Sequence, residues 1–140
     1  MAKTVGIYLR PETEKELSAR GENRSHVIAR DLSRLYTLYN RAIREVTLTE
    51  KEACLIVDTL NGVILDAGTA QYLWAEVEDS VKLNNLAEKW GVDGPALVEK
   101  LRDLNALQTM ALVDGAEKVW QTAGRISLPE GIRKVFNISD

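Results

Sequence analysis

Thr-Val-Gly-Ile-Tyr-Leu, at residues 4–9, sets the architecture that the rest of the chain must satisfy. Its large aliphatic residues stand at every second position, namely Val5, Ile7 and Leu9. Alternation with period two among β-branched residues predicts a half-buried β-strand. Such a short strand cannot stand alone, because its backbone groups need hydrogen-bond partners, and no second strand pattern lies nearby. We therefore expect this strand to pair with the same strand of a second copy across a two-fold axis, which gives an antiparallel ribbon.

Two helices are expected after the strand. Pro11 opens the first, since proline is tolerated at the first helical position, and the helix covers residues 13–20 before Gly21 ends it. The second begins at Asn23, a good N-cap residue, and extends to near Arg44. Its apolar residues recur at steps of three and four, which forms a heptad-like stripe of Ile28, Leu32, Leu35, Tyr39, Ala42 and Val46.

The paired ribbon would bury its aliphatic face against the helices of both copies and leave its other face exposed. The exposed face carries the remaining strand positions, which are Thr4, Gly6 and Tyr8. A two-stranded ribbon fits the major groove of B-DNA, where exposed side chains can meet base edges. The sequence therefore predicts that this face contacts double-stranded DNA.

With these features, residues 3–40 resemble the ribbon-helix-helix (MetJ/Arc/CopG-type) superfamily of DNA-binding proteins. The resemblance depends on the alternating strand, the short helix and the connection Gly-Glu-Asn-Arg-Ser at residues 21–25, followed by Ile28 and Leu32. In the family the corresponding connection is typically Gly-x-Ser/Asn-basic-Ser-x-x-Ile. The resemblance implies an obligate, intertwined homodimer that uses its ribbon to read DNA.

The resemblance also implies roles for particular residues. Base contacts would fall on the outward strand positions already named, and phosphate contacts on Arg10, Asn23, Arg24 and Ser25. The physics of a helix start agrees with a phosphate site, because free N–H groups and the positive end of the helix dipole favour an anion.

The sequence departs from the family pattern at three points. Gly6 offers no side chain for base readout, so sequence discrimination would either be shallow or depend on Thr4, Tyr8 and Arg10. Asp31 stands where the family usually has a small apolar residue. The second helix is also expected to be longer than its counterpart in the family.

Charge is unevenly distributed along the 140 residues, although the net charge is only −3. Residues 1–45 hold nine Lys/Arg against six Asp/Glu, whereas residues 46–140 hold nine against fifteen. We expect two domains: a basic ribbon-helix-helix domain at 1–45 and an acidic helical domain at 46–140 for oligomerisation, partner binding or effector binding. The fold class is expected to be mainly α, with an N-terminal ribbon-helix-helix followed by an all-α C-terminal domain.

The acidic part reads as short helices separated by turn signals. Thr49 and Glu52 have the spacing of a capping box that opens a helix. Gly91 ends another helix, and Gly94-Pro95 starts the next. A turn is expected at Asp66-Ala67-Gly68-Thr69, and a break between helices is expected at Asp114-Gly115. The tail is expected to hold an extended piece at 125–128 and then a last turn.

Few residues offer catalytic or metal-binding chemistry. His26 is the sole histidine and Cys54 the sole cysteine, which excludes a multi-histidine metal site within one chain. Without a Ser/His/Asp set or a glycine-rich phosphate loop, the expectation is a protein that is not an enzyme and takes no cofactor. The lone cysteine, the absence of a long apolar run and the polar N-terminus predict a cytoplasmic protein.

Three features have two interpretations each. Trp74, Trp90 and Trp120 are expected to anchor the core, with a small-molecule pocket as the alternative. Residues 86–97 are weakly similar to a helix-turn-helix, but their acidic surroundings favour a structural turn. Four arginines of the second helix are expected to form a solvated face, with phosphate contact as the alternative: Arg30, Arg34, Arg41 and Arg44.

The leading functional prediction is a sequence-specific DNA-binding transcriptional regulator of the repressor type. The alternative is an antitoxin or another protein-interaction module whose acidic C-terminal domain binds a partner protein. The well-patterned helices of residues 50–122 favour the regulator, because antitoxins of this fold usually carry a shorter, disordered tail.

Overall fold

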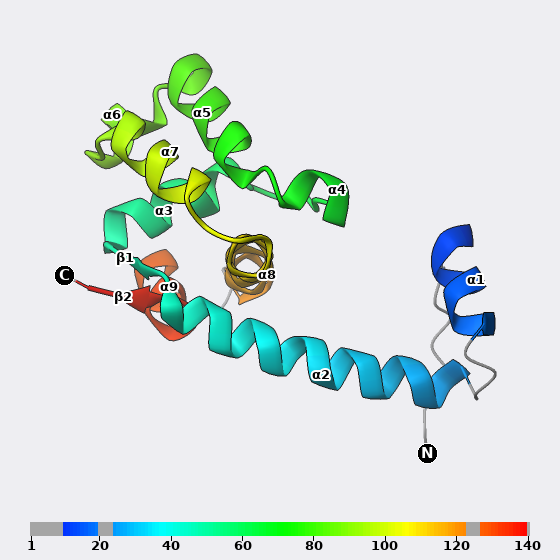
Figure 1. Cartoon of the computed structure of the whole chain (residues 1–140). Helices are drawn as coiled ribbons and strands as arrows, with labels where there is room; N and C mark the ends of the chain where they lie inside the picture. Colours follow the sequence, from blue (N-terminus) through cyan, green and yellow to red (C-terminus); the bar gives the residue numbers. More distant parts are fainter. Residues whose placement is uncertain (1–9, 20–23, 123–126, 140) are drawn as a thin grey trace. The chain divides into compact units, whose positions relative to one another are not determined.

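The computed structural model describes residues 10–19, 24–122 and 127–139, and this part of the chain is mainly helical, with one short two-stranded sheet (Figure 1). The mainly α fold class is thus confirmed, while the strand expected at 4–9 lies outside the described residues. In chain order the elements are α1 (Pro11–Ala19), α2 (Arg24–Glu45), β1 (Thr47–Leu48), α3 (Glu50–Thr59), α4 (Ala67–Ala70), α5 (Leu73–Asn84), α6 (Leu86–Trp90), α7 (Gly94–Arg102), α8 (Ala106–Thr122), α9 (Leu128–Val135) and β2 (Asn137–Ile138).

The chain divides into two compact units, Met1–Thr37 and Leu38–Asp140, and α2 belongs partly to each. The first unit contains α1 and the first part of α2, while the second contains the end of α2 and all later elements. The division therefore falls within a helix rather than at the joint after residue 45, and the domain boundary at 45/46 stays a prediction.

Helix α3 is the centre of the second unit. Its run of residues 53–57 is buried on all sides, because α5, α6, α8 and α9 all pack against it. The predicted capping box opens this helix: the Glu52 amide donates to Thr49 Oγ1 at 3.1 Å, and the Thr49 amide donates to Glu52 Oε1 at 2.9 Å. This local prediction is confirmed.

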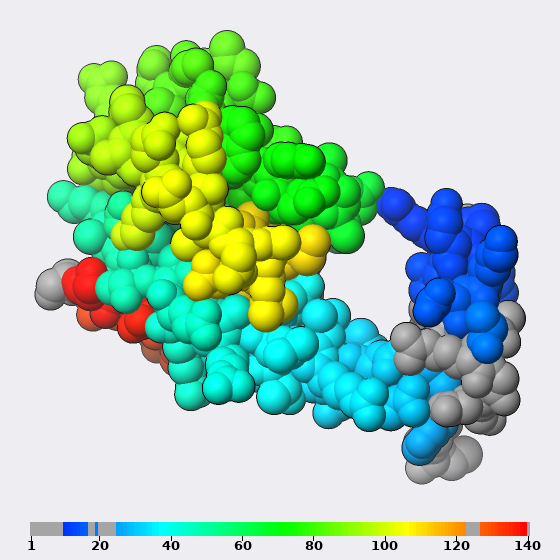
Figure 2. Space-filling view, viewed as in Figure 1, coloured from blue at the N-terminus to red at the C-terminus, as the bar shows by residue number. Residues whose placement is uncertain are grey.

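The C-terminal strand β2 pairs with β1, which lies in the connection between α2 and α3. Strands β1 and β2 pair in parallel, with Thr47 opposite Asn137, and Figures 1 and 2 show the red C-terminal segment beside this connection. The side-chain Nδ2 of Asn137 also donates a hydrogen bond to the Arg44 backbone carbonyl at 2.9 Å, which satisfies an acceptor at the end of α2. The sequence predicted neither strand, and Leu128, expected to be extended, is instead the first residue of α9.

Other turn predictions had mixed outcomes. Gly91 ends α6 in the left-handed conformation with φ of 67°, as predicted, and α7 begins at Gly94. Where a turn was expected at 66–69, the structure has the short helix α4 at Ala67–Ala70, which Asp66 caps by accepting a hydrogen bond from the Thr69 backbone amide. The break expected at Asp114-Gly115 is wrong, because α8 continues through both residues.

Asp58 links α3 to α6. Its Oδ2 atom accepts hydrogen bonds from Lys89 Nζ at 2.8 Å and from Trp90 Nε1 at 2.9 Å. Burial would raise the pKa of this carboxyl, but the bonds from Lys89 and Trp90 outweigh burial and leave the pKa lowered. The ionised carboxylate is therefore the form that the fold stabilises.

Replacing Asp58 by Asn is expected to lower the free energy of unfolding by about 1–2 kcal/mol, because a charge-assisted pair of hydrogen bonds is lost. In the wild type this contribution is present at neutral pH and disappears as the pH falls through the lowered pKa, since protonation removes the charge that the fold favours. Urea denaturation at several pH values measures both effects. The exposed Asp79→Asn is the control, and equal acid sensitivity of Asp58→Asn and the wild type would contradict the assignment.

Candidate nucleic-acid interface

The structure describes only part of the predicted DNA-contacting set. Thr4, Gly6, Tyr8 and Asn23 lie outside the described residues. Arg10 is exposed immediately before α1, and its carbonyl accepts a hydrogen bond from the Glu14 amide at 3.0 Å.

The expected phosphate site lies where α2 begins. Arg24 is the first residue of α2. The N-cap role predicted for Asn23 falls outside the described residues and stays a prediction. Ser25 follows in the first turn with an exposed side chain. The first turn of an α-helix carries N–H groups without intrahelical partners, which suit a phosphate. Arg24 and Ser25 therefore lie in the first turn of a helix, and their contact with phosphate stays a prediction.

The apolar stripe of α2 changes character along the helix. Near its end, Ala42 and Val46 are buried within the second unit. In its middle the same stripe is uncovered: Leu32 is 42% exposed and Leu35 36% exposed. Uncovered leucines at helical spacing form an apolar face that a partner could bury. We call Leu32 and Leu35, with their exposed neighbour Tyr36, the open stripe.

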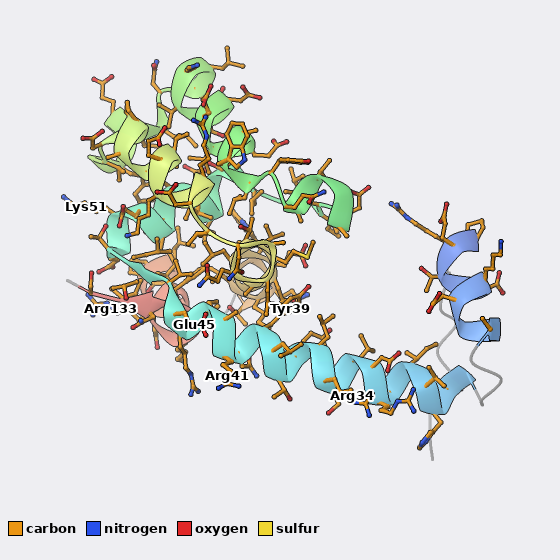
Figure 3. All side chains as sticks on the ribbon, viewed as in Figure 1. Arg34, Tyr39, Arg41, Glu45, Lys51 and Arg133 are labelled. Carbon is orange, nitrogen blue, oxygen red and sulfur yellow. The ribbon has the colours of Figure 1, made fainter. Side chains whose placement is uncertain are left out.

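The opposite side of α2 is basic. Each residue of an α-helix turns the side chain by about 100°, so positions 30, 34, 41 and 44 fall on the side away from Leu32 and Leu35. We call these four arginines the basic stripe; Arg30 is partly buried and the other three are exposed. In Figure 3, Tyr39 lies on the side of α2 that faces α8, whereas Arg41 projects from another side of the helix. The sequence predicted a solvated face for these arginines, but not that this face lies opposite the apolar residues. The spacing of the residues along the helix already contains this information.

Asp31, which departs from the family pattern, has a partner next to it. Its Oδ1 atom accepts from Arg30 Nε at 3.4 Å, and both side chains are partly buried. The pair reduces the positive charge at the start of the basic stripe. Arg34, Arg41 and Arg44 have no acidic partner among the described residues, so they supply most of its charge.

The weak helix-turn-helix pattern at 86–97 forms a turn between α6 and α7. The start of α7 is capped by its own acid, because Asp93 Oδ1 accepts from the Ala96 amide at 3.1 Å. A carboxylate in this position occupies the place where a phosphate would bind and repels it. The acidic surroundings and this cap favour the structural interpretation that the sequence predicted.

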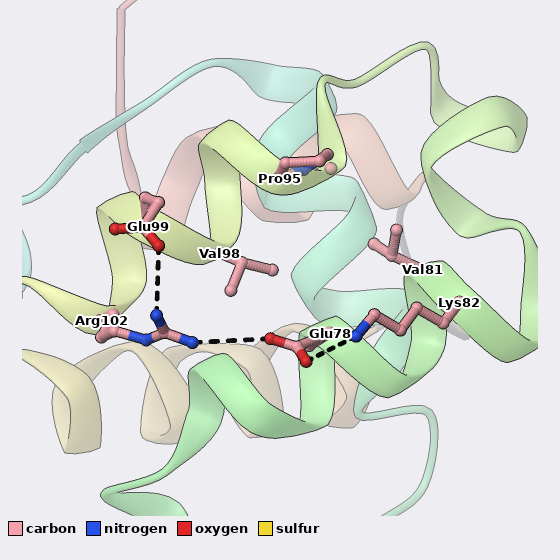
Figure 4. A pocket seen from close by; sticks show the side chains of 8 residues that line it. Glu78, Val81, Lys82, Pro95, Val98, Glu99 and Arg102 are labelled. Carbon is pink, nitrogen blue, oxygen red and sulfur yellow. Dashed lines mark hydrogen bonds and ion pairs between the residues drawn. The ribbon is translucent and has the colours of Figure 1, made fainter.

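A hollow of about 200 Å³ lies between α5 and α7 (Figure 4). Its charged side chains are bound to one another: Arg102 reaches Glu99 at 3.2 Å and Glu78 at 3.6 Å, and Glu78 also accepts from Lys82 at 2.8 Å. The Glu78 pKa is lowered by its bond to Lys82 and by the charges of Lys82 and Arg102. These mutual pairs leave little charge to attract a ligand.

The three tryptophans are held at three different places. The Arg102 guanidinium carbon lies 4.4 Å from the centroid of the Trp74 ring. Trp90 donates a hydrogen bond from Nε1 to Asp58. Trp120 donates from Nε1 to the Val57 carbonyl at 2.9 Å. All three are partly buried and pack against the core. A single pocket lined by all three tryptophans is therefore not formed in the described part of the chain.

The described residues also bear on metal binding, on membrane crossing and on the state of the cysteine. Within residues 10–19, 24–122 and 127–139, no group of three His, Cys, Asp or Glu residues is placed to hold a metal ion. In the same ranges, no helix combines the length and the apolar character that crossing a bilayer requires. Cys54 is buried in the core, as predicted, and burial followed by the charges of Glu50 and Asp58 raises its pKa.

Comparison with known proteins adds no relative. The chain matches no protein-family model, no curated protein and no solved structure. Function is therefore inferred from the chain's own residues.

Proposed function

We propose that the chain is a dimeric, sequence-specific DNA-binding regulator of the ribbon-helix-helix type. Two copies pair their N-terminal strands into a ribbon that enters the major groove, with Thr4, Gly6 and Tyr8 toward the base edges. Arg10, Asn23, Arg24 and Ser25 hold the flanking phosphates. The acidic residues of the second unit would disfavour contact with the DNA backbone, because like charges repel.

The observation that carries this proposal is the two-sided character of α2. Its open stripe places two large leucines in water, which a second copy would cover in an intertwined dimer. The side opposite carries three arginines without acidic partners among the described residues, which are suited to phosphates. One helix thereby provides an apolar surface for dimerisation and a cationic surface for DNA.

Replacing Arg24 by Ala is expected to weaken binding to all DNA sequences by about tenfold and to reduce the salt dependence of affinity, because one phosphate contact per subunit is lost. Replacing Tyr8 by Ala is expected to relax sequence preference and to leave non-specific binding nearly unchanged. Fluorescence anisotropy against DNA fragments selected from the genome, at a series of salt concentrations, measures both. Folded, dimeric variants that bind as the wild type does would refute these roles.

Lys89→Ala is the matched control for charge. It removes one cation from the acidic unit, so DNA affinity should stay within about twofold of the wild type if phosphates contact only the N-terminal part. Failure of the wild type to bind DNA at low salt would instead favour the antitoxin alternative, in which a partner protein occupies the acidic domain. Purification of the chain with a tightly bound protein from the same cells would then support that alternative.

A further inference from the structure

A second hollow lies between the loop that follows α3 and the end of α8. It has a volume of about 250 Å³, and its described lining residues are Leu60, Gly62, Val63, Ile64, Glu117, Trp120 and Gln121. Ile64 is 84% exposed, an unusual position for a large aliphatic side chain. The loop that carries it turns at Gly62, whose φ of 68° is a conformation that glycine adopts without strain. The result is an apolar recess that is open to solvent.

Among the described residues that line this recess, Glu117 is the one that carries a charge, and it also lines a neighbouring hollow of about 140 Å³ with Met110, Val113 and Asp114. No described residue supplies Glu117 with a cationic partner, because the adjacent Lys118 is bound to Asp114 at 3.2 Å. Burial, followed by the charge of Asp114, raises the Glu117 pKa. A partly buried carboxylate without a cation nearby is the arrangement that a positively charged ligand would stabilise.

We propose that this recess binds a small organic cation with an apolar body. The aliphatic side chains and Trp120 would cover the apolar body, while the Glu117 carboxylate would accept a hydrogen bond from the ammonium group. An aromatic wall adds attraction for a cation, whereas the Glu117 carboxylate disfavours anionic ligands. Its volume of about 250 Å³ suits a small organic molecule. The site lies wholly in the second unit and does not depend on the DNA-binding proposal.

Three probes of the same apolar body test the chemistry by calorimetric titration of the full chain. Phenethylammonium is the cation, phenethyl alcohol the neutral analogue and phenylacetate the anion. The wild type is expected to bind the cation roughly tenfold more tightly than the alcohol, as a partly buried charge-assisted hydrogen bond would give, and the anion most weakly. Glu117→Gln should remove the preference for the cation while leaving the affinity for the alcohol unchanged.

Two further variants separate a specific site from general effects. Glu88→Gln removes the same charge from α6 and should keep the preference for the cation. Ile64→Ser shortens an exposed wall, so it should fold normally and bind all three probes several-fold more weakly. Equal affinity of the wild type for the cation and the alcohol, no detectable binding of the cation, or an unchanged preference in Glu117→Gln would each overturn the proposal.

Discussion

Leu35→Glu is expected to convert the proposed dimer into a monomer and to abolish the proposed binding to a specific DNA site. Leu35 lies in the middle of the open stripe, and dimerisation would bury it against the second copy. A glutamate there would be buried without a cationic partner in both copies, which would raise the dimer dissociation constant by about a hundredfold or more. Because a ribbon needs two strands, the monomer would also lose its major-groove reader.

The measurements are sedimentation equilibrium for the dimer and anisotropy for DNA binding. Leu35 is already 36% exposed within the monomer, so the variant should keep its helical content, which circular dichroism checks. Leu83→Glu, at a side chain 77% exposed on α5, is the control and should remain dimeric. A Leu35→Glu protein that stays dimeric at micromolar concentration would show that the open stripe is not the dimer surface.

The parts of the fold that the sequence predicted are local. Thr49 caps a helix through Glu52 three residues later, and Gly91 ends one by adopting a left-handed conformation, so both signals lie within a few residues of the structure that they form. The parallel pair of β1 and β2 was missed because Thr47 and Asn137 are far apart in the chain and each strand has only two residues. Pairing of this kind depends on tertiary packing rather than on a local pattern.

The candidate interface was predictable to a similar degree. The spacing of apolar residues and arginines along α2 fixes which side of the helix each occupies, and this information is present in the sequence. Whether a leucine on that side is covered depends on neighbouring elements: Ala42 and Val46 are buried, but Leu35 of the same stripe is not. The lack of a cation beside Glu117 likewise became visible only when Lys118 was found bound to Asp114.

Gly115 shows most clearly how packing overrides a local signal, since Asp-Gly predicts a break and the structure has a continuous helix. A Cβ atom at this position would lie 2.8 Å from Ile43 Cδ1, 3.0 Å from Val135 Cγ1 and 3.2 Å from Phe136 Cε1. The glycine therefore lets α8 approach the end of α2 and the α9 segment closely, at the known cost of a weaker helix.

Gly115→Val is accordingly expected to lower the free energy of unfolding by about 3 kcal/mol, because its side chain must displace three packed residues, and chemical denaturation measures the loss. Gly68→Ala is the control: its nearest neighbour is Asp66 Oδ1 at 3.4 Å, an ordinary contact, so its stability should equal that of the wild type or exceed it slightly. If α8 contained a true break at Gly115, valine could turn away from the core and both variants would unfold alike. A large loss of stability confined to Gly115→Val would instead mean that position 115 needs glycine for the close approach of three elements. The Asp114-Gly115 pair would then reflect a packing requirement rather than a turn.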